Sequence, residues 1–227
     1  MNEEGELSKS QIDRLGSRLR NSAEPDEDDL RLLNRYRERF VPVHDGIVEA
    51  LRQHIDYPVE SRYKSVPSIV AKLRRRQPAR LSAIQDIAGA RIIVPNATRQ
   101  TPLVDRILSL YSDAAVDDKR DRPTYGYRAV HLIVSRPLPF EVQIRTPIQH
   151  TWAQLSERLA DRYGFDLKYG GGPEDVRQAL LELGDFGTVI ERLRIAADEG
   201  RLDMNSLDAV KRFEDRLPSL LKMLKVR

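Results

Sequence analysis

YGYRAVHLIVSRPLPFEVQIRT, residues 125–146, has the pattern of two short strands. Successive side chains of a strand point to opposite faces, so residues two apart share a face. In the first strand Tyr127 and His131 share a face with the small Ala129, and in the second strand Glu141, Gln143 and Arg145 share a face. An ordinary half-buried strand would expose serine, threonine or lysine at these polar positions. The stretch therefore predicts the floor of a site.

Strand-like and helix-like segments alternate on both sides of this stretch, between residues 58 and 165. Strand-like runs lie at 59–65, 86–94 and 114–116, and helical spacing follows Pro67, returns at 103–111 and runs from 147 to about 164. Such alternation, with helices before and after it, predicts an α/β sandwich around a mixed sheet of about five strands.

The two ends of the chain differ from this central region. Residues 1–25 are polar and acidic, and we expect a flexible N-terminal segment. Residues 26–57 repeat apolar side chains at three- and four-residue spacing, which predicts an N-terminal helical region interrupted near Pro42. The central region, 58–165, gives way to a C-terminal helical region, 166–227, with helices expected at roughly 174–197 and 203–225.

Composition excludes several classes of protein. The 227 residues contain no cysteine, which excludes disulfides, thiolate metal sites and cysteine nucleophiles. The chain has no run of about 18 apolar residues and its N-terminus is acidic, so we expect neither a membrane span nor secretion, but a cytoplasmic protein. The net charge of +3 is too small to indicate nucleic-acid binding from the total alone.

Arginines nevertheless gather in the central part of the chain. One group follows the helix that begins near Pro67 and the other lies in the loop before Gly126: Arg74, Arg75, Arg76 and Arg80, then Arg120 and Arg122. A basic surface is one interpretation, and arginines solvated on helix faces are the other.

Two carboxylates, Asp86 and Glu141, fall at strand-edge positions among many cations, which are Arg62, Lys64, Lys72, Arg91 and Arg145. Mg²⁺ prefers carboxylate and phosphate oxygens as ligands, and arginine forks bind the remaining phosphate charge. The set therefore suits a polyphosphate bound with Mg²⁺, and the alternative is a group of ordinary surface salt bridges. The glycines of a P-loop are absent, which excludes a Walker-type nucleotide site.

Four motifs in these segments match one family in order and spacing. They are Arg62-x-Lys64-Ser65-x-x-Ser68-Ile69-x-x-Lys72, Asp86-Ile87-x-Gly89-x-Arg91, Gly126-Tyr127-Arg128-x-x-His131 and Glu141-Val142-Gln143-Ile144-Arg145-Thr146. Over roughly residues 58–165 the chain resembles the synthetase domain of the RelA/SpoT alarmone synthetases. No metal-dependent hydrolase motifs precede this region, so we expect a single-domain small alarmone synthetase.

The resemblance implies a nucleotidyltransferase-like fold with additional N- and C-terminal helices. It also implies transfer of the β,γ-pyrophosphate of ATP to a ribose 3′-hydroxyl, with release of AMP. Position by position, Arg62 and Arg91 match the arginines that stack on the adenine of ATP. Lys64, Ser68 and Lys72 match the groups that hold its phosphates.

The same resemblance assigns the metal and the acceptor. Asp86 matches the Mg²⁺-binding aspartate, and Glu141 matches the glutamate that serves as second metal ligand or as base toward the acceptor hydroxyl. Tyr127 matches the tyrosine that stacks on the acceptor's base. The surrounding acceptor and phosphate contacts are matched by His131, Gln143 and Arg145.

The loop before Gly126 departs from the guanosine-nucleotide synthetases of the family, which usually carry Pro-Lys before the Gly-Tyr pair. Pro123 stands at or next to the place of that lysine, and only Arg122 or Lys119 could substitute for it. This departure argues against a tight grip on the phosphates of GDP or GTP.

Two further segments, Gln149-His150-x-Trp152-Ala153 and residues 168–172, resemble the toxic small alarmone synthetases of toxin–antitoxin pairs. Some of these modify the 3′-terminal adenosine of tRNA and so block translation, and a tRNA needs more basic surface outside the pocket. We therefore expect a tRNA acceptor contacted by the six arginines above, and a protein antitoxin as a further candidate partner. GDP or GTP as acceptor, giving (p)ppGpp, is the alternative, an adenosine nucleotide is another, and a non-catalytic nucleotide-binding or interaction module is the remote one.

Overall fold

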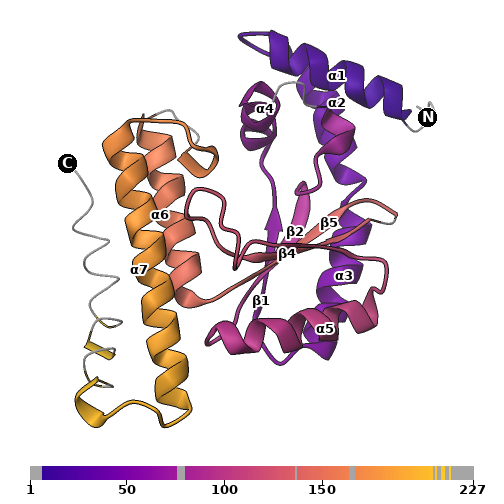
Figure 1. Cartoon of the computed structure of the whole chain (residues 1–227). Coiled ribbons are helices and arrows are strands. Elements are labelled where there is room, and N and C mark those ends of the chain that lie inside the picture. The colour runs from indigo at the N-terminus through magenta and orange to yellow at the C-terminus, as the bar shows by residue number, and fades with distance from the viewer. Residues whose placement is uncertain are drawn as a thin grey trace. The chain divides into compact units, whose positions relative to one another are not determined.

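The computed structural model describes residues 7–75, 80–135, 137–163 and 167–206, together with residues 208, 211, 212 and 215. A five-stranded sheet has the strand order β1-β2-β5-β4-β3 (Figure 1). Its strands are β1 (Val59–Tyr63), β2 (Ala88–Ile93), β3 (Ala115–Asp118), β4 (Val130–Val134) and β5 (Phe140–Arg145). Helices precede, separate and follow these strands, which confirms the predicted α/β fold with a sheet of about five strands.

The chain forms two compact units. The first comprises Met1–Arg91, Tyr111–Ala115 and Leu132–Gln143, and the second comprises Ile92–Leu110, Val116–His131 and Ile144–Arg227. Strands β2, β4 and β5 each contribute residues to both units. The predicted segment boundaries at residues 57 and 165 stay a prediction.

The first unit contains a helix near the N-terminus that the sequence pattern did not predict. Helix α1 (Lys9–Asn21) starts at a capping box formed by Ser8 and Gln11. It buries Leu15 and Leu19 completely or nearly so, and its Arg18 pairs with Asp29 at 2.6 Å. The expectation of a flexible segment over residues 1–25 is therefore wrong for 9–21, while residues 1–6 lie outside the described residues. Apolar side chains at three- and four-residue spacing supply enough buried surface to fix even a polar segment.

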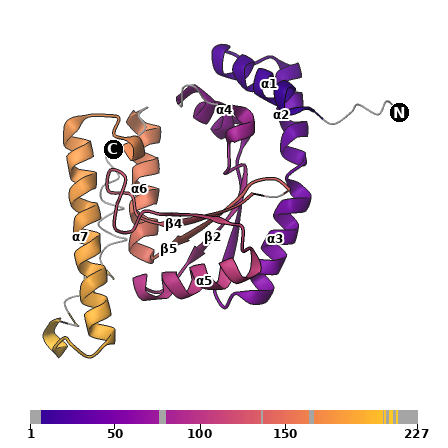
Figure 2. The same ribbon diagram turned by 45° about the vertical axis from the view of Figure 1, so that its right-hand side comes forward.

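Three more helices complete the helical part of the first unit. They are α2 (Glu27–Glu38), α3 (Val41–His54) and α4 (Val66–Arg75). The interruption between α2 and α3 confirms the break predicted near Pro42, which lies in the first turn of α3 where a missing N–H costs nothing. Helices α1, α2 and α4 contact one another (Figure 2), and Arg74 of α4 donates hydrogen bonds to the carbonyls of Ser22 and Ala23 at 2.7 and 3.0 Å.

Gly89 on β2 allows the close approach of a neighbouring backbone. A Cβ at Gly89 would lie 2.5 Å from the carbonyl oxygen of Glu141 on β5. We therefore expect Gly89→Ala to lower the free energy of unfolding by about 1–3 kcal/mol, because the two backbones would have to separate.

The matched control for this substitution is Gly46→Ala. Gly46 lies in α3, and a Cβ added there would meet no atom within 4 Å beyond its chain neighbours and the nearby backbone of its own helix. Alanine there should therefore be neutral or should stabilise the helix by up to about 1 kcal/mol. Urea unfolding of both variants measures the difference. Equal stabilities would contradict the role given to Gly89.

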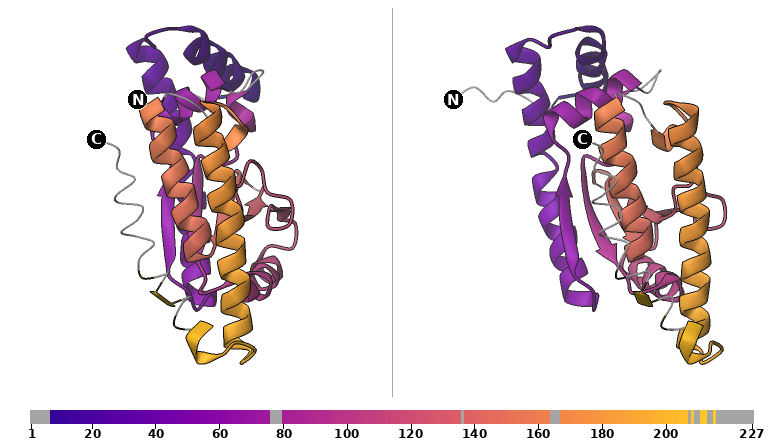
Figure 3. Two further views of the ribbon diagram at one scale, coloured as in Figure 1. Left: turned by 60° about the vertical axis from the view of Figure 1, so that its left-hand side comes forward. Right: turned by 90° about the vertical axis from the view of Figure 1, so that its left-hand side faces the viewer.

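The second unit contains the helices α5 (Gln100–Leu110), α6 (Pro147–Tyr163) and α7 (Glu174–Asp198), with short 3-10 helices η2 (Ala97–Arg99) and η3 (Leu167–Tyr169). Helices α6 and α7 lie side by side in every view (Figure 3). Trp152, Leu155, Leu167 and Leu180 form their shared core.

Helix α7 ends within one residue of the predicted helix 174–197. The second predicted helix, 203–225, falls mostly outside the described residues. Among the residues that the structure describes, no helix combines the length and the apolar character needed to cross a membrane.

Candidate active site

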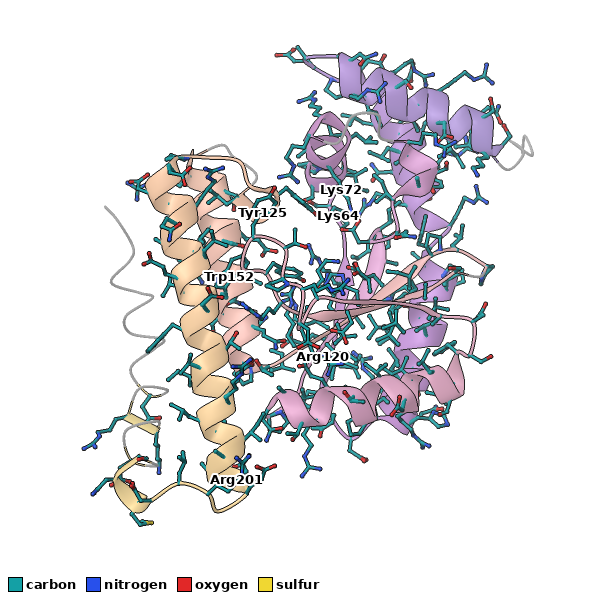
Figure 4. All side chains as sticks on the ribbon, viewed as in Figure 1. Lys64, Lys72, Arg120, Tyr125, Trp152 and Arg201 are labelled. Atoms are coloured by element: carbon teal, nitrogen blue, oxygen red, sulfur yellow. The ribbon has the colours of Figure 1, made fainter. Side chains whose placement is uncertain are left out.

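Asp86 is the centre of a charged cluster in the first unit. Its Oδ1 accepts a hydrogen bond from Lys72 Nζ at 2.7 Å, and its Oδ2 accepts one from Lys64 Nζ at 3.0 Å. Lys64 directly follows β1 and Lys72 lies on α4, and the two lysines are labelled in Figure 4. The strand and the helix after it bring both ammonium groups to one carboxylate. The structure thus joins three of the residues that the sequence singled out.

Burial makes this cluster electrostatically strong. The Asp86 side chain is 14% exposed and that of Lys64 is 8% exposed. Burial by itself would raise the pKa of Asp86, but the ammonium groups of Lys72 and Lys64 outweigh it and hold that pKa well below its usual range. Burial also lowers the pKa of Lys64, and Asp86 opposes this effect. One ionised carboxylate therefore faces two cations, which leaves a surplus of positive charge.

The other predicted ATP-binding residues lie on the same elements of the first unit. Arg62 is half-buried on β1, and Ser68 is exposed near the start of α4 with its Oγ 2.8 Å from that of Ser65. Arg91 lies on β2, with its Nη1 3.9 Å from Glu60 Oε2. Their predicted roles at the adenine and the phosphates stay predictions.

Glu141 and Gln143 share a face of β5, as the alternation of the strand predicts. Gln143 Nε2 donates a hydrogen bond to Glu141 Oε2 at 2.5 Å, and the Gln143 side chain is buried. This bond fixes the orientation of the carboxylate. Glu141 therefore meets the first requirement of a base or metal ligand, which is a side chain held in one position.

The predicted acceptor residues of the second unit contact one another directly. Arg145 Nη2 donates to Tyr127 Oη at 2.7 Å, and Tyr127 Oη lies 2.7 Å from His131 Nε2. The guanidinium carbon of Arg145 lies 5.3 Å from the centre of the Tyr127 ring, and the Trp152 ring is 6.0 Å away. Tyr127 is 7% exposed, so its predicted stacking on an acceptor base stays a prediction.

One detail of the predicted first strand is wrong. Strand β4 begins only at Val130, and Tyr127 lies in a turn, where its backbone N–H donates to the carbonyl of Thr124 at 2.9 Å. A straight strand would separate residues 127 and 131 by about 13 Å. The side chains of Tyr127 and His131 nevertheless reach each other, with Tyr127 Oη 2.7 Å from His131 Nε2. The turn before Tyr127 depends on Gly126, whose φ of +86° few other residues tolerate.

A buried polar network in the second unit was not anticipated. Gln149 Oε1 accepts hydrogen bonds from Gln100 Nε2 at 2.9 Å and from the backbone N–H of Thr146 at 3.2 Å. The Thr146 hydroxyl donates to Glu191 of α7, and burial raises the pKa of Glu191. Gln149, which the sequence linked to the toxic subgroup, therefore connects Thr146, the residue after β5, to Gln100 of α5 and Glu191 of α7. Glu191, a charged residue among the apolar positions of α7, was the feature of the sequence that could have indicated this buried network.

Some of the arginines predicted to contact tRNA bond to other parts of the chain at the surface. Arg74 donates to the carbonyls of Ser22 and Ala23, just after α1 ends. Arg120 forms an ion pair with Asp118 at 2.5 Å and donates to Thr101 Oγ1 at 2.8 Å. Arg80 and Arg122 are exposed, as is Arg75 at the end of α4, and Arg76 lies outside the described residues. Contact of this set with tRNA stays a prediction.

Comparison with known proteins places this geometry in a family. Residues 61–164 match the model of a region found in RelA / SpoT proteins. An uncharacterized protein of Mycobacterium tuberculosis (strain H37Rv) is 36% identical over 181 residues, which cover 77% of this chain and 66% of that protein. The chain thus spans about two thirds of the length of the curated relatives it matches.

Two solved structures have the same fold. The small alarmone synthetase 1 from Bacillus subtilis, bound to its product pppGpp, is 26% identical with a TM-score of 0.58, over 78% of this chain and 99% of that one. A GTP pyrophosphokinase family protein from Streptococcus pneumoniae is 24% identical with a TM-score of 0.55, over 78% of this chain and 96% of that one.

The matched region contains all four sequence motifs, from Arg62 to Thr146, and the whole Asp86 cluster. The fold, the spacing of the motifs and the family match agree on one assignment. This chain therefore contains the region found in RelA / SpoT proteins and has the fold of the small alarmone synthetases.

Proposed function

We propose that the chain is an ATP-dependent pyrophosphotransferase that moves the β,γ-pyrophosphate of ATP to a ribose 3′-hydroxyl and releases AMP. The observation that carries this proposal is the Asp86 cluster, where two ammonium groups share one buried carboxylate. Such a surplus of fixed positive charge suits a polyphosphate. The match of residues 61–164 to the region found in RelA / SpoT proteins supports the same reaction.

In this proposal Lys64 and Lys72 bind the phosphates of ATP, with Ser68 at the start of α4 beside them. Arg62 and Arg91 hold the adenine. These side chains come from β1, α4 and β2 of the first unit. Their task is to position the triphosphate and to neutralise its charge, because phosphoryl transfer needs little covalent help from the protein.

The residues present fit a Mg²⁺ ion that arrives with the nucleotide. Mg²⁺ is usually held by one or two carboxylates together with substrate phosphates, and the carboxylate of Asp86 is kept ionised with both oxygens turned toward cationic groups. When bound, Mg²⁺ would neutralise charge on the phosphate oxygens. Glu141, oriented by Gln143, is the second candidate ligand or the base that takes the proton of the acceptor hydroxyl.

The proposed acceptor is the 3′-terminal adenosine of tRNA, contacted by Tyr127, His131 and Arg145. The loop from Asp121 to Gly126 carries Pro123 at or next to the place of the phosphate-binding lysine, which favours an acceptor that needs little phosphate grip. GDP or GTP is the second candidate, because one structural neighbour is a small alarmone synthetase bound to pppGpp. Action on tRNA would make the chain a cytoplasmic inhibitor of translation, for which a protein antitoxin is a fitting partner.

One labelling experiment tests both acceptors. The protein is incubated with γ-labelled ATP and Mg²⁺, in one reaction with deacylated tRNA and in another with GDP and GTP. We expect label on tRNA, and none on tRNA whose terminal ribose has been oxidised with periodate. Label in the nucleotide alone would replace the proposed acceptor with GDP or GTP, and label in neither would contradict the proposed reaction.

A further inference from the structure

Tyr125 occupies a turn position that suits other residues better. Thr124 and Tyr127 exchange two backbone hydrogen bonds, of 2.9 and 3.3 Å, so Tyr125 and Gly126 are the central residues of a two-residue turn. Both have positive φ, +51° for Tyr125 and +86° for Gly126. A turn of this kind favours asparagine followed by glycine, because a bulky side chain at positive φ is strained.

This strain stands alone in the part of the chain that the structure describes. Tyr125 is the only non-glycine residue there with a positive φ. Residues held in such conformations concentrate at functional sites, where another requirement decides the residue type. The turn itself would be easier to form with asparagine. The reason for a tyrosine at position 125 must therefore lie in its ring.

The ring of Tyr125 is fixed in place but is not used in the core. Tyr125 is 49% exposed and is labelled in Figure 4. A Cβ at Gly170 would lie 2.4 Å from two carbons of the ring, so the ring packs directly against this glycine. Gly170 is held in turn by Arg177, whose Nη1 donates to its carbonyl at 2.9 Å. The ring therefore rests against the backbone at Gly170 and keeps about half of its surface accessible.

We propose that the ring of Tyr125 is a stacking platform for a nucleobase of a polynucleotide acceptor, namely the base next to the nucleotide that receives pyrophosphate. A fixed, half-exposed aromatic ring is the feature by which proteins bind single-stranded RNA, because every base has a π-face. Tyr125 lies two residues before Tyr127, which the proposed function places at the acceptor nucleotide itself. The inference thus rests on tRNA as the acceptor, and it names the residue that would distinguish a polynucleotide from a free nucleotide.

The substitution Tyr125→Asn removes the aromatic ring and keeps the turn. Asparagine is favoured at this turn position, so the variant should unfold at the same temperature as the parent or at a higher one. Its KM for deacylated tRNA should rise by about tenfold or more, the size of one lost base stack, while its KM for ATP stays unchanged. Tyr125→Phe keeps the ring and should keep the parent's KM for tRNA.

A second acceptor identifies the base involved. The parent's KM for a tRNA with an abasic penultimate nucleotide should equal the KM of Tyr125→Asn for intact tRNA. The variant should have the same KM for both tRNAs, because the substitution and the missing base remove the same contact. A well-folded Tyr125→Asn protein with the parent's KM for tRNA would overturn the platform and leave the proposed function in place. A further loss on the abasic tRNA, or an equal loss with ATP, would also overturn it. A parent that labels only GDP or GTP would overturn the tRNA acceptor and the platform together.

Discussion

Glu141→Gln is expected to lower the rate of pyrophosphate transfer by about 10³-fold or more and to leave the fold intact. The substitution removes the negative charge that a metal ligand or base needs, and almost nothing of the shape. Gln143 Nε2 donates to Glu141 Oε2 in the parent, and the amide oxygen of a glutamine can accept the same bond. Release of AMP from ATP, in the presence of the acceptor identified by labelling, measures the rate.

Glu49→Gln is the matched control, since Glu49 is an exposed residue of α3 in the same unit. It makes the same chemical change away from the proposed site and should behave as the parent does. Thermal unfolding followed by circular dichroism checks that both variants fold. A folded Glu141→Gln protein that turns over within tenfold of the parent would refute the role given to Glu141.

Asp86→Asn is expected to abolish activity and, unlike the Glu141 variant, to destabilise the protein by about 3–5 kcal/mol. The amide no longer balances the charge of Lys64, whose side chain is only 8% exposed. Denaturant unfolding should therefore place the variant well below the parent, with nucleotide absent from both samples. An Asp86→Asn protein as stable as the parent would show that the ion pairs contribute little to folding.

The pH dependence of this loss has a definite sign. Burial already lowers the pKa of Lys64, and removing Asp86 removes the largest influence that raises it. The folded-state pKa then falls further below the unfolded value, so between the two values the unfolded chain binds more protons and stability rises with pH. The deficit of Asp86→Asn should thus be largest at neutral pH and shrink as the pH approaches the ordinary lysine value.

The double variant Lys64→Met/Asp86→Asn tests whether the unbalanced charge of Lys64 causes the loss of stability. Methionine fills the space of the lysine stem without a charge, and Lys72, with its side chain 20% exposed, can turn toward water. We expect the double variant to recover most of the lost stability and none of the activity. A double variant less stable than Asp86→Asn would mean that the unpaired charge of Lys64 is not the cause.

The sequence predicted those parts of the molecule that depend on local patterns. Alternating strand and helix segments indicated the five-stranded sheet, and the spacing Lys64, Lys72 and Asp86 marked the residues that meet at the charged cluster. Period and spacing suffice there, because a strand followed directly by a helix leaves few geometries open.

Other features depend on contacts between distant segments, which a local pattern does not contain. Helix α1 is polar in composition, and its few apolar residues become decisive only when α2 and α4 cover them. The positive φ of Tyr125 contradicts the usual turn preference of tyrosine, so no propensity could indicate it. Glu191 reaches Thr146 across 45 residues of chain, a separation that sequence spacing cannot resolve.

The shared carboxylate of Asp86 sets a condition on what can enter the site. Asp86 is already a counter-ion of Lys64 and Lys72. An anion that replaces it therefore gains only the difference between its own interaction energy with the lysines and that of Asp86. A free phosphate that drew both lysines away from Asp86 would leave this largely buried carboxylate without a counter-ion. A ligand that carries its own cation alongside its phosphates can satisfy the lysines and the aspartate at once. We therefore expect the cluster to favour a metal-bound polyphosphate over the abundant inorganic phosphate of a cell, before any contact with a base or sugar.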